Sequence, residues 1–412
     1  MLSEVPEGWD KARIDAVLQR NTTSVSVTEL AAEGLVAHYS LPAFDANKKP
    51  VIESGSEIKS NKTAIDKDCL LFSKLNPRIP RVWRVRHFGE QKPVCSTEFW
   101  ALKPKTDEVS LSYAEYFLGW NGFLSHSSIK PASSTNSHQR VDRKAFDAFM
   151  LPLPPLNEQR RIAEILSSVD ASIQATQAVI EQAERVKRGL MEELLTGGLG
   201  SEAIERGEVP EGWRLLPLGE FAKIKNGFAF KSKEFLSDDS ADGDVLLVVR
   251  MSDFNGGYVD TSHCKRIQKT TANGLEKFRL KQGDILVAMS GATVGKLGRV
   301  PATANELYLN QRVGCMQPTQ CSAEFLWQLV NTPFFQATVL AAATGNAQPN
   351  ISSKELEKIE FALPPEDTQH RIVSALTAFD DFITKHKVIG EQQNLAKRGL
   401  MDDLLTGKVR TV

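Results

Sequence analysis

Two clusters of basic residues are the clearest sign of chemistry in this sequence. Eight Lys or Arg residues lie between positions 74 and 105 against two Glu, and eight more lie between 265 and 299 against one Glu and one Asp. Each cluster therefore has a charge of +6, inside a chain whose net charge is −1. Ammonium and guanidinium groups bind phosphate oxygens, and Arg also donates to guanine edges. These clusters predict contact with nucleic acid.

Within the first cluster, Arg81, Arg84 and Arg86 alternate with Trp83 and His87. This mixture suits phosphate contacts and the reading of base edges. We predict DNA contacts from Lys74, Arg78, Arg81, Arg84, Arg86, Lys225, Asn226, Ser290, Lys296, Arg299 and Arg312, with the loops 133–140 and 344–350 as secondary candidates. For each single residue, a solvated strand face is the alternative.

No stretch of the sequence fits a catalytic motif. SGATVGKL (290–297) is one residue short of a phosphate loop, and Leu297 stands where magnesium binding needs a hydroxyl group. NPRI (76–79) lacks the second proline and the aromatic residue of an adenine methyltransferase loop, and no GxGxxG opens a dinucleotide-type fold. His263 and Cys264 are adjacent but have no partner at metal-ligand spacing. We therefore expect a non-catalytic chain without a metal or cofactor of its own.

Length and composition limit the architecture that must position these residues. A chain of 412 residues exceeds one ordinary core, so two or three domains are expected. Five cysteines without a CxxC pair favour reduced thiols and a cytoplasmic protein. No signal peptide is predicted, and no apolar run reaches the ~20 residues that span a bilayer, so no membrane partner is expected.

The longest repeated stretch divides the chain. KRGLMEELLTG (187–197) returns as KRGLMDDLLTG (397–407), 210 positions later, and the match extends upstream without a gap to PP at 154 and 364. A shorter repeat, VPEGW, occurs at 5–9 and 209–213. The chain reads as two globular blocks, each followed by a repeat. The predicted boundaries are 1–153, 154–197, a linker at 198–212, 213–363 and 364–412.

Both repeats predict long helices. Pro-Pro precedes each, Asn157 and Asp367 are candidate N-caps, and Gly197 and Gly407 end them, which leaves roughly 39 residues or about 58 Å. Apolar residues recur at alternating steps of four and three, which favours a coiled coil. The predicted seam is Ile162, Leu166, Val169, Ile173, Ile180, Leu190, Leu194, Ile372, Leu376, Phe379, Ile383, Leu400 and Leu404. Packing of each helix on its own block alone is the alternative.

The blocks predict a mixed α/β (α+β) fold. Short apolar runs indicate strands at 68–75, 81–88, 244–251, 284–290 and 295–300. Helices are predicted at 112–120 and at 323–343, the latter broken near Pro333. The order of these elements corresponds between the blocks, so we expect one scaffold used twice.

The repeats resemble a known family. Pro-Pro-(x)3-Gln-x-Arg-Ile leading a helix that ends in Lys-Arg-Gly-Leu-Met-x-x-Leu-Leu-Thr-Gly is similar to the conserved regions of type I restriction-modification specificity subunits, and each copy follows a variable block ending in LPLPP (151–155) or ALPP (362–365). The resemblance implies two target recognition domains separated by two conserved helices that form an antiparallel coiled coil.

In that family each recognition domain reads one half of a bipartite site on double-stranded DNA. The resemblance further implies two modification (M) subunits docked on the conserved regions and restriction (R) subunits in the full complex. S-adenosylmethionine for adenine methylation and ATP with Mg²⁺ for cleavage would then be held by those partners. The competing hypothesis is a coiled-coil scaffold that assembles proteins and does not bind DNA.

Overall fold

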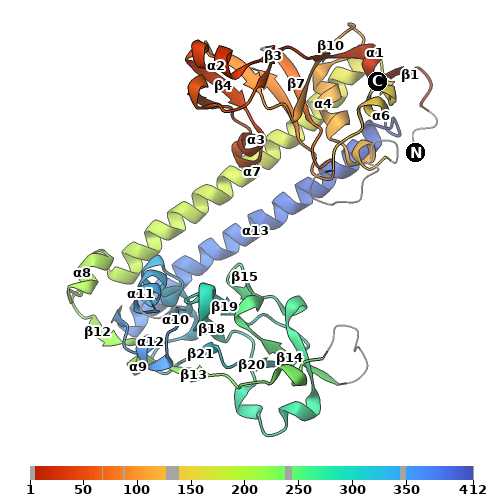
Figure 1. The fold of residues 1–412 in the computed structure, drawn as a ribbon. Coiled ribbons are helices and arrows are strands. Elements are labelled where there is room, and N and C mark those ends of the chain that lie inside the picture. Colours follow the sequence, from red (N-terminus) through yellow and green to blue (C-terminus); the bar gives the residue numbers. More distant parts are fainter. Residues whose placement is uncertain are drawn as a thin grey trace. The chain divides into compact units, whose positions relative to one another are not determined.

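The computed structural model describes residues 5–66, 68–86, 89–126, 139–236, 244–343 and 349–411. The chain divides into two compact units. Unit 1 comprises residues 1–178 and 387–412, and unit 2 comprises residues 179–386. Each long helix contributes to both units, since α7 (Leu156–Thr196) and α13 (Glu366–Leu404) run across the division (Figure 1).

Unit 1 combines two sheets and a strand pair. Its strands are β1 (Asp10–Arg13), β2 (Leu18–Asn21), β3 (Ser24–Val25), β4 (Leu35–Tyr39), β5 (Val51–Ser54), β6 (Lys62–Ala64), β7 (Asp68–Ser73), β8 (Val82–Arg86), β9 (Lys92–Cys95), β10 (Phe99–Pro104) and β11 (Met150–Leu153). Its shorter helices are α1 (Ile14–Val17), α2 (Val27–Glu33), α3 (Leu41–Asn47), α4 (Leu111–Gly119), α5 (Asn121–Leu124) and α6 (Arg143–Ala148). The sheets have the strand orders β2-β10-β7-β8 and β3-β6-β9-β4-β5, and β1 pairs with β11.

Unit 2 repeats this plan. Its strands are β12 (Arg214–Pro217), β13 (Ala222–Asn226), β14 (Val245–Val249), β15 (Phe254–Asn255), β16 (Tyr258–Val259), β17 (Lys265–Gln268), β18 (Ile285–Ala288), β19 (Leu297–Arg299), β20 (Leu307–Leu309), β21 (Val313–Pro318) and β22 (Glu360–Leu363). Its shorter helices are α8 (Ser201–Glu205), α9 (Leu218–Phe221), α10 (Ala323–Val330), α11 (Pro333–Ala343) and α12 (Ser353–Leu356). The order β13-β21-β18-β19 matches β2-β10-β7-β8, and β12-β22 matches β1-β11.

The predicted strands and helices of the blocks are confirmed to within two residues at their ends, and residues 87 and 88 of the predicted strand 81–88 lie outside the described residues. The break expected near Pro333 is present, since α10 ends at Val330 and α11 begins at Pro333. The predicted N-caps are wrong by position. α7 begins at Leu156 and α13 at Glu366, so Asn157 and Asp367 lie inside the first turn. The carbonyl of the second proline of each pair already accepts the first helical bond, from Glu158 in α7 and from Thr368 in α13.

The two long helices run antiparallel in each unit. In unit 1, Gln393 Nε2 donates to Ser172 Oγ at 2.9 Å, and Lys397 pairs with Asp170 at 2.5 Å. The residue of α7 that is contacted has a lower number as the residue number in α13 increases, so the two helices are antiparallel. Unit 2 has the same antiparallel order. Ile383 of α13 packs with Ile180 and Ala183 of α7, and Asp380, earlier in α13, pairs with Lys187, later in α7. All thirteen predicted seam residues are buried or half-buried.

The seam residues do not all face the other long helix. Ile162 and Leu166 belong to the apolar core of unit 1, together with α4 residues such as Phe117. Ile372 and Leu376 join the corresponding core of unit 2. The first turns of each long helix are therefore packed on the block that precedes it, and the coil begins further along.

Candidate nucleic-acid interface

In unit 2, loops at one end of the sheets converge. Three backbone bonds connect them: Asn310 N donates to Val249 O (3.2 Å), Gln311 N to Phe228 O (2.8 Å) and Met289 N to Arg312 O (3.0 Å). The segment after the undescribed residues 344–348 joins through a bridge between Ser290 and Asn350. We call residues 226–228, 250–253, 289–293, 310–312 and 349–351 the unit 2 loop cluster.

Unit 1 has an equivalent convergence. Asn76 N donates to Gln139 O at 2.7 Å, Val141 N to Lys74 O at 2.8 Å, and Ser96 N to Tyr39 O at 3.0 Å. The bridge between Leu75 and Arg140 corresponds to the Ser290–Asn350 bridge of unit 2. We call residues 39–41, 74–80, 96–98 and 139–141 the unit 1 loop cluster. The same backbone framework thus presents different side chains in the two units.

Three of the predicted contacts of unit 2 lie in its loop cluster. Asn226 and Arg312 are exposed, and Ser290 is half-buried. The Ser290 hydroxyl donates to Met251 Sδ at 3.5 Å, and the Asn226 amide donates to Ser353 Oγ at 3.4 Å. The Arg312 backbone N–H donates to Asn310 Oδ1 at 3.5 Å, and among the described residues the Arg312 guanidinium has no ion pair. The side chains of Asn226, Ser290 and Arg312 therefore lie in one loop cluster and can form further hydrogen bonds.

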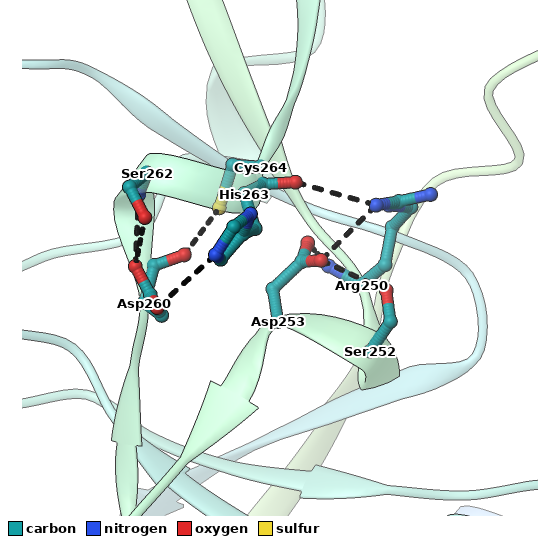
Figure 2. Close-up of polar contacts among 7 residues, drawn as sticks. All are labelled: Arg250, Ser252, Asp253, Asp260, Ser262, His263 and Cys264. Carbon is teal, nitrogen blue, oxygen red and sulfur yellow. Dashed lines mark hydrogen bonds and ion pairs between the residues drawn. The ribbon is translucent and has the colours of Figure 1, made fainter. Parts of the chain in front are cut away.

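Sequence reasoning missed Arg250, which follows β14 in the same cluster. Figure 2 shows its guanidinium facing Asp253, whose side chain is 1% exposed. Arg250 Nη2 donates to Asp253 Oδ1 at 3.1 Å and to His263 O at 3.4 Å, while the carboxylate also accepts from Arg250 N and Ser252 Oγ at 2.8 Å each. The buried carboxylate thus positions the Arg250 guanidinium in the loop cluster, where its side chain is 33% exposed. An arginine directly after an apolar strand was the available signal.

His263 and Cys264 have structural surroundings in the described residues. The Cys264 thiol lies near Asp260 O at 3.6 Å, and burial raises its pKa to about 12, so it is protonated at neutral pH. His263 Nε2 lies 3.9 Å from Asp260 Oδ2, and its side chain is 77% exposed. Among the residues described, no three His, Cys, Asp or Glu side chains are grouped to hold a metal ion.

The unit 1 loop cluster contains Lys74 and Arg78 from the predicted set. Lys74 is half-buried and Arg78 is exposed. Between them, Asn76 has a positive φ of 51°, and its buried Oδ1 has no hydrogen-bond partner. Arg140 pairs with Glu98 at 2.6 Å in the same cluster. The other residues of the secondary candidate loops, 133–138 and 344–348, lie outside the described residues.

Arg81, just before β8, and Arg84, within it, have carboxylate partners. Arg81 makes a two-point contact with Asp45 (2.7 and 2.8 Å), and Arg84 pairs with Asp68 at 2.7 Å. Their side chains are only 13% and 14% exposed. Burial lowers the pKa of Arg84, which lies on the α4 side of the sheet near Glu115. Arg86, two residues on, is exposed.

The other predicted cations of unit 2 are spread along the sheet. Lys225 is half-buried in β13. Lys296 donates to Phe254 O at 2.5 Å, and Arg299 pairs with Glu324 at 3.1 Å above the ring of Trp327. The structure therefore does not bring these three into one group with Arg312.

The repeated helix ends form a second arrangement that occurs in both units. In unit 2 Lys187 is 8% exposed and pairs with Asp380, which also accepts from Gln328 at 3.2 Å. Thr196-Gly197 then meets the second VPEGW, because a Cβ on Gly197 would lie 2.3 Å from Pro210 Cγ. Arg188 and Gly189 stay exposed between these two contacts.

Unit 1 has the equivalent contacts. Lys397 pairs with Asp170, which accepts from the Tyr116 hydroxyl at 2.9 Å. A Cβ on Gly407 would lie 2.3 Å from Pro6 Cγ of the first VPEGW. Arg398 and Gly399 are the exposed pair. Contacts inside each unit thus explain much of the repeated sequence. The exposed pairs Arg188-Gly189 and Arg398-Gly399 take no part in these contacts.

The duplicated scaffold and its paired loop clusters define a protein built from two copies of one mixed α/β module. A family model described as "Type I restriction modification DNA specificity domain" matches residues 6–185 and 210–393, so the chain belongs to that family. It is a type I restriction-modification specificity subunit, which implies recognition of a DNA target and makes it the non-catalytic member of its system.

Individual relatives agree. The chain is 26% identical to the type I restriction enzyme MjaVIII specificity subunit of Methanocaldococcus jannaschii, over 98% of this chain and 94% of that protein. It is 27% identical to the EcoBI specificity subunit of Escherichia coli, over 64% of this chain and 58% of that protein.

Two solved structures share the fold. One comes from work on complex assembly and conformational transition of the type I R-M system (TM-score 0.60, 18% identity, 98% of this chain and 100% of that one). The other is an S subunit from M. genitalium (TM-score 0.56, 14% identity, 98% and 96%). None of the helices in the described ranges is long and apolar enough to span a membrane.

Proposed function

We propose that each loop cluster reads one half of a bipartite DNA target. The observation that supports this most directly is the shared framework with unshared side chains: matching backbone bridges at Leu75–Arg140 and Ser290–Asn350 present unlike polar groups. Base edges are distinguished by donor and acceptor patterns, so unlike groups on like frames read unlike sequences.

In unit 2 the proposed contacts are Asn226, Arg250, Ser290 and Arg312. Amide side chains suit adenine, and arginine suits guanine. In unit 1 they are Lys74, Arg78 and Arg140, with Asn76 between them. Lys225, Lys296, Arg299 and Arg86 are proposed as contacts outside the two clusters. Arg140, Arg250 and Arg299 also have carboxylate partners, but their side chains are 60%, 33% and 24% exposed. Arg81 and Arg84 remain candidates, but their side chains are only 13% and 14% exposed, so each would first have to leave its carboxylate partner.

We further propose that the repeated helix ends dock two modification subunits. Support comes from the exposed pairs Arg188-Gly189 and Arg398-Gly399, which have equal places beside equal buried contacts. Two like surfaces fit two copies of one partner. The modification subunits would hold S-adenosylmethionine and methylate adenine, and restriction subunits would supply ATP- and Mg²⁺-dependent cleavage.

Mapping of methylated adenines in cells that express this chain with its modification subunit tests the reading of DNA. Arg312→Ala should relax one half-site by ~1–3 kcal/mol if the guanidinium contacts a guanine, and leave the other half-site unchanged. Arg140→Ala should affect the opposite half-site. Arg214→Ala, on β12 outside both clusters, removes the same charge as a control. A uniform loss on all sequences would assign Arg312 to phosphate, and no effect would remove it from the interface.

The scaffold alternative makes a different prediction about salt. A complex that binds DNA through several Lys and Arg residues loses affinity steeply as salt increases, because counterions are released. Binding of the purified complex to target and random duplexes between low and physiological salt therefore separates the hypotheses. A flat response and no methylated sites would favour the scaffold.

A further inference from the structure

Unit 2 contains a cavity of about 540 Å³ beside the repeated helix end. Its walls come from the end of α7, from α8, from the turn between α10 and α11, and from β22. The lining is mainly apolar and includes Met191, Leu195, Leu329 and Phe334. Arg188, Glu192 and Glu205 supply charges, and Thr332 supplies a hydroxyl group. The family assignment does not account for this cavity.

The internal duplication shows which residues of unit 1 correspond to it. Along the helices before the cavity, a spacing of 212 residues pairs Tyr116 with Gln328, which donate to the equivalent carboxylates Asp170 and Asp380. The same spacing pairs Phe123 with Phe335, both 0% exposed. It therefore pairs Trp120 with Thr332. Along the long helices, the spacing of 210 residues pairs Asp402 with Glu192.

In unit 1 an indole ring fills the corresponding place. Trp120 is 5% exposed, and its Nε1 donates to Asp402 Oδ1 at 2.6 Å. Its ring centroid lies 5.9 Å from that of Phe117, the counterpart of the cavity residue Leu329. The apolar wall and the carboxylate thus hold an aromatic ring with an N–H donor.

Unit 2 keeps the wall and the carboxylate but lacks the ring. Thr332 is too small to fill the space, and its hydroxyl serves the start of α11, donating to Leu329 O (2.9 Å) and accepting from Phe335 N (3.2 Å). The carboxylate of exposed Glu192 has no hydrogen-bond or ion-pair partner among the described residues. An apolar pocket with one well-placed acceptor has the usual make-up of a specific binding site.

We propose that this cavity is a socket for a tryptophan side chain of a partner protein. The apolar wall takes the ring, and Glu192 accepts the indole N–H as Asp402 does from Trp120. With Glu205 on the same rim, the site favours hydrogen-bond donors and disfavours acidic residues. Since Trp120 already fills the counterpart in unit 1, the partner occupies this site once per chain. Arg188 and Gly189 line the cavity too, so this partner adjoins the surface proposed for a modification subunit in unit 2. The inference is independent of how DNA is read.

The test uses N-acetyl-L-tryptophanamide as the probe, titrated onto the full chain and followed by ligand-observed NMR. Saturable binding is expected. The Thr332→Trp variant should abolish it, because the new side chain supplies the missing ring. The Trp120→Thr variant should add a second site in unit 1. Absence of saturable binding up to the solubility limit, or binding unchanged by Thr332→Trp, would overturn the proposal.

A hydrogen-bond cycle keeps the test valid if Thr332→Trp does not fold. Removing the N–H with the 1-methyl analogue should weaken binding by about five- to tenfold, the effect of one hydrogen bond. Glu192→Ala should weaken the parent probe equally and leave the 1-methyl analogue unaffected. If Glu192→Ala weakened binding of the 1-methyl analogue as much as binding of the parent probe, the assignment of Glu192 as the acceptor would be contradicted.

A last arm identifies the source of the ring. A capped Gly-Trp-Gly peptide should bind at least as tightly as free indole if a protein segment is the natural occupant. Free indole binding about tenfold tighter than the peptide would overturn the protein source and indicate a small molecule. Methylation mapping of Thr332→Trp serves as the control, and both half-sites should persist whatever the probe does.

Discussion

Lys187 and Asp380 form a 2.6 Å ion pair between α7 and α13 in unit 2, and the residues 210 positions away, Asp170 and Lys397, form the same pair in unit 1 at 2.5 Å. One copy of the repeat supplies the lysine from its end and the other supplies the aspartate from its middle. Each pair thus joins the two repeats, which explains why both copies retain both residues. It also fixes the register of the antiparallel helices within each unit.

The ion pair of unit 2 should contribute more to stability than its counterpart. The Lys187 side chain is 10% exposed, while Lys397 is 25% exposed and more strongly screened by water. Lys187→Ala should lower the free energy of unfolding by ~1–3 kcal/mol, because the ion pair is lost. The cost is not larger, because Asp380 is exposed enough to regain water and keeps its hydrogen bond from Gln328. Lys397→Ala should cost under about 1 kcal/mol. Urea unfolding with localised hydrogen exchange measures both, and a larger loss for Lys397→Ala would refute the ranking.

The sequence was sufficient to predict the duplicated scaffold. Strands such as 285–288 and 297–299 follow from short apolar runs, and the long helices follow from a 39- to 41-residue span with Gly at its end. These features are local or periodic. The N-cap positions failed because Pro155 and Pro365 supply the first carbonyl acceptors, a role that cap preferences do not capture.

The site was predictable only in part, because partners distant in sequence decide which cations are available. Asn226, Ser290 and Arg312 meet at one end of unit 2, whereas Arg81 is held by Asp45, 36 residues away. A count of charges cannot separate these cases. The Arg250–Asp253 pair lies within three residues of sequence, but the burial of its carboxylate comes from the fold and cannot be read from a local pattern.

The glycines that end the repeats should resist substitution. Gly197 has φ +59°, and an added Cβ would lie 2.3 Å from Pro210 Cγ. Gly198 has φ +84° with nothing within 4 Å, so it is a matched control for backbone strain alone. Gly198→Ala should cost about 1 kcal/mol, and Gly197→Ala at least ~1 kcal/mol more because the proline must move. Thermal unfolding measures the difference. Equal costs would show that contact with VPEGW is unimportant.

The ion pair between Arg410 and Glu158 should make the stability of the protein depend on pH. Arg410 donates to both carboxylate oxygens (2.8 and 2.9 Å) and Trp9 Nε1 adds a third bond (3.0 Å), while the Glu158 side chain is 1% exposed. Bonding to Arg410 lowers the pKa of Glu158 below its ordinary value of 4.5. A carboxylate whose pKa is lower in the folded state than in the unfolded state stabilises the protein at pH values above its ordinary pKa. This stabilisation is lost as the pH falls through the pKa of the folded state.

Glu158→Gln should therefore remove stability at pH 7 and reduce the loss of stability below pH ~4.5. Arg410→Ala should act in the same direction. Glu164→Gln, an exposed position on the same helix, should leave the pH profile unchanged. Unfolding midpoints between pH 7 and pH 3 measure this effect. An unchanged acid limb in Glu158→Gln would assign the acid sensitivity to other carboxylates.

If the long helices set the distance between half-sites, their length should set the spacer. Both helices pass from one unit to the other near positions 178 and 387, so a heptad inserted there in both leaves the Lys187–Asp380 and Lys397–Asp170 pairs intact within their units. Seven residues add about 10 Å of helix, close to three base pairs of duplex. Methylation mapping should show both half-sites with a spacer about three base pairs longer. A heptad in α7 alone is the control and should abolish modification, because the helices no longer match in length. Altered half-sites with an unchanged spacer would refute the idea.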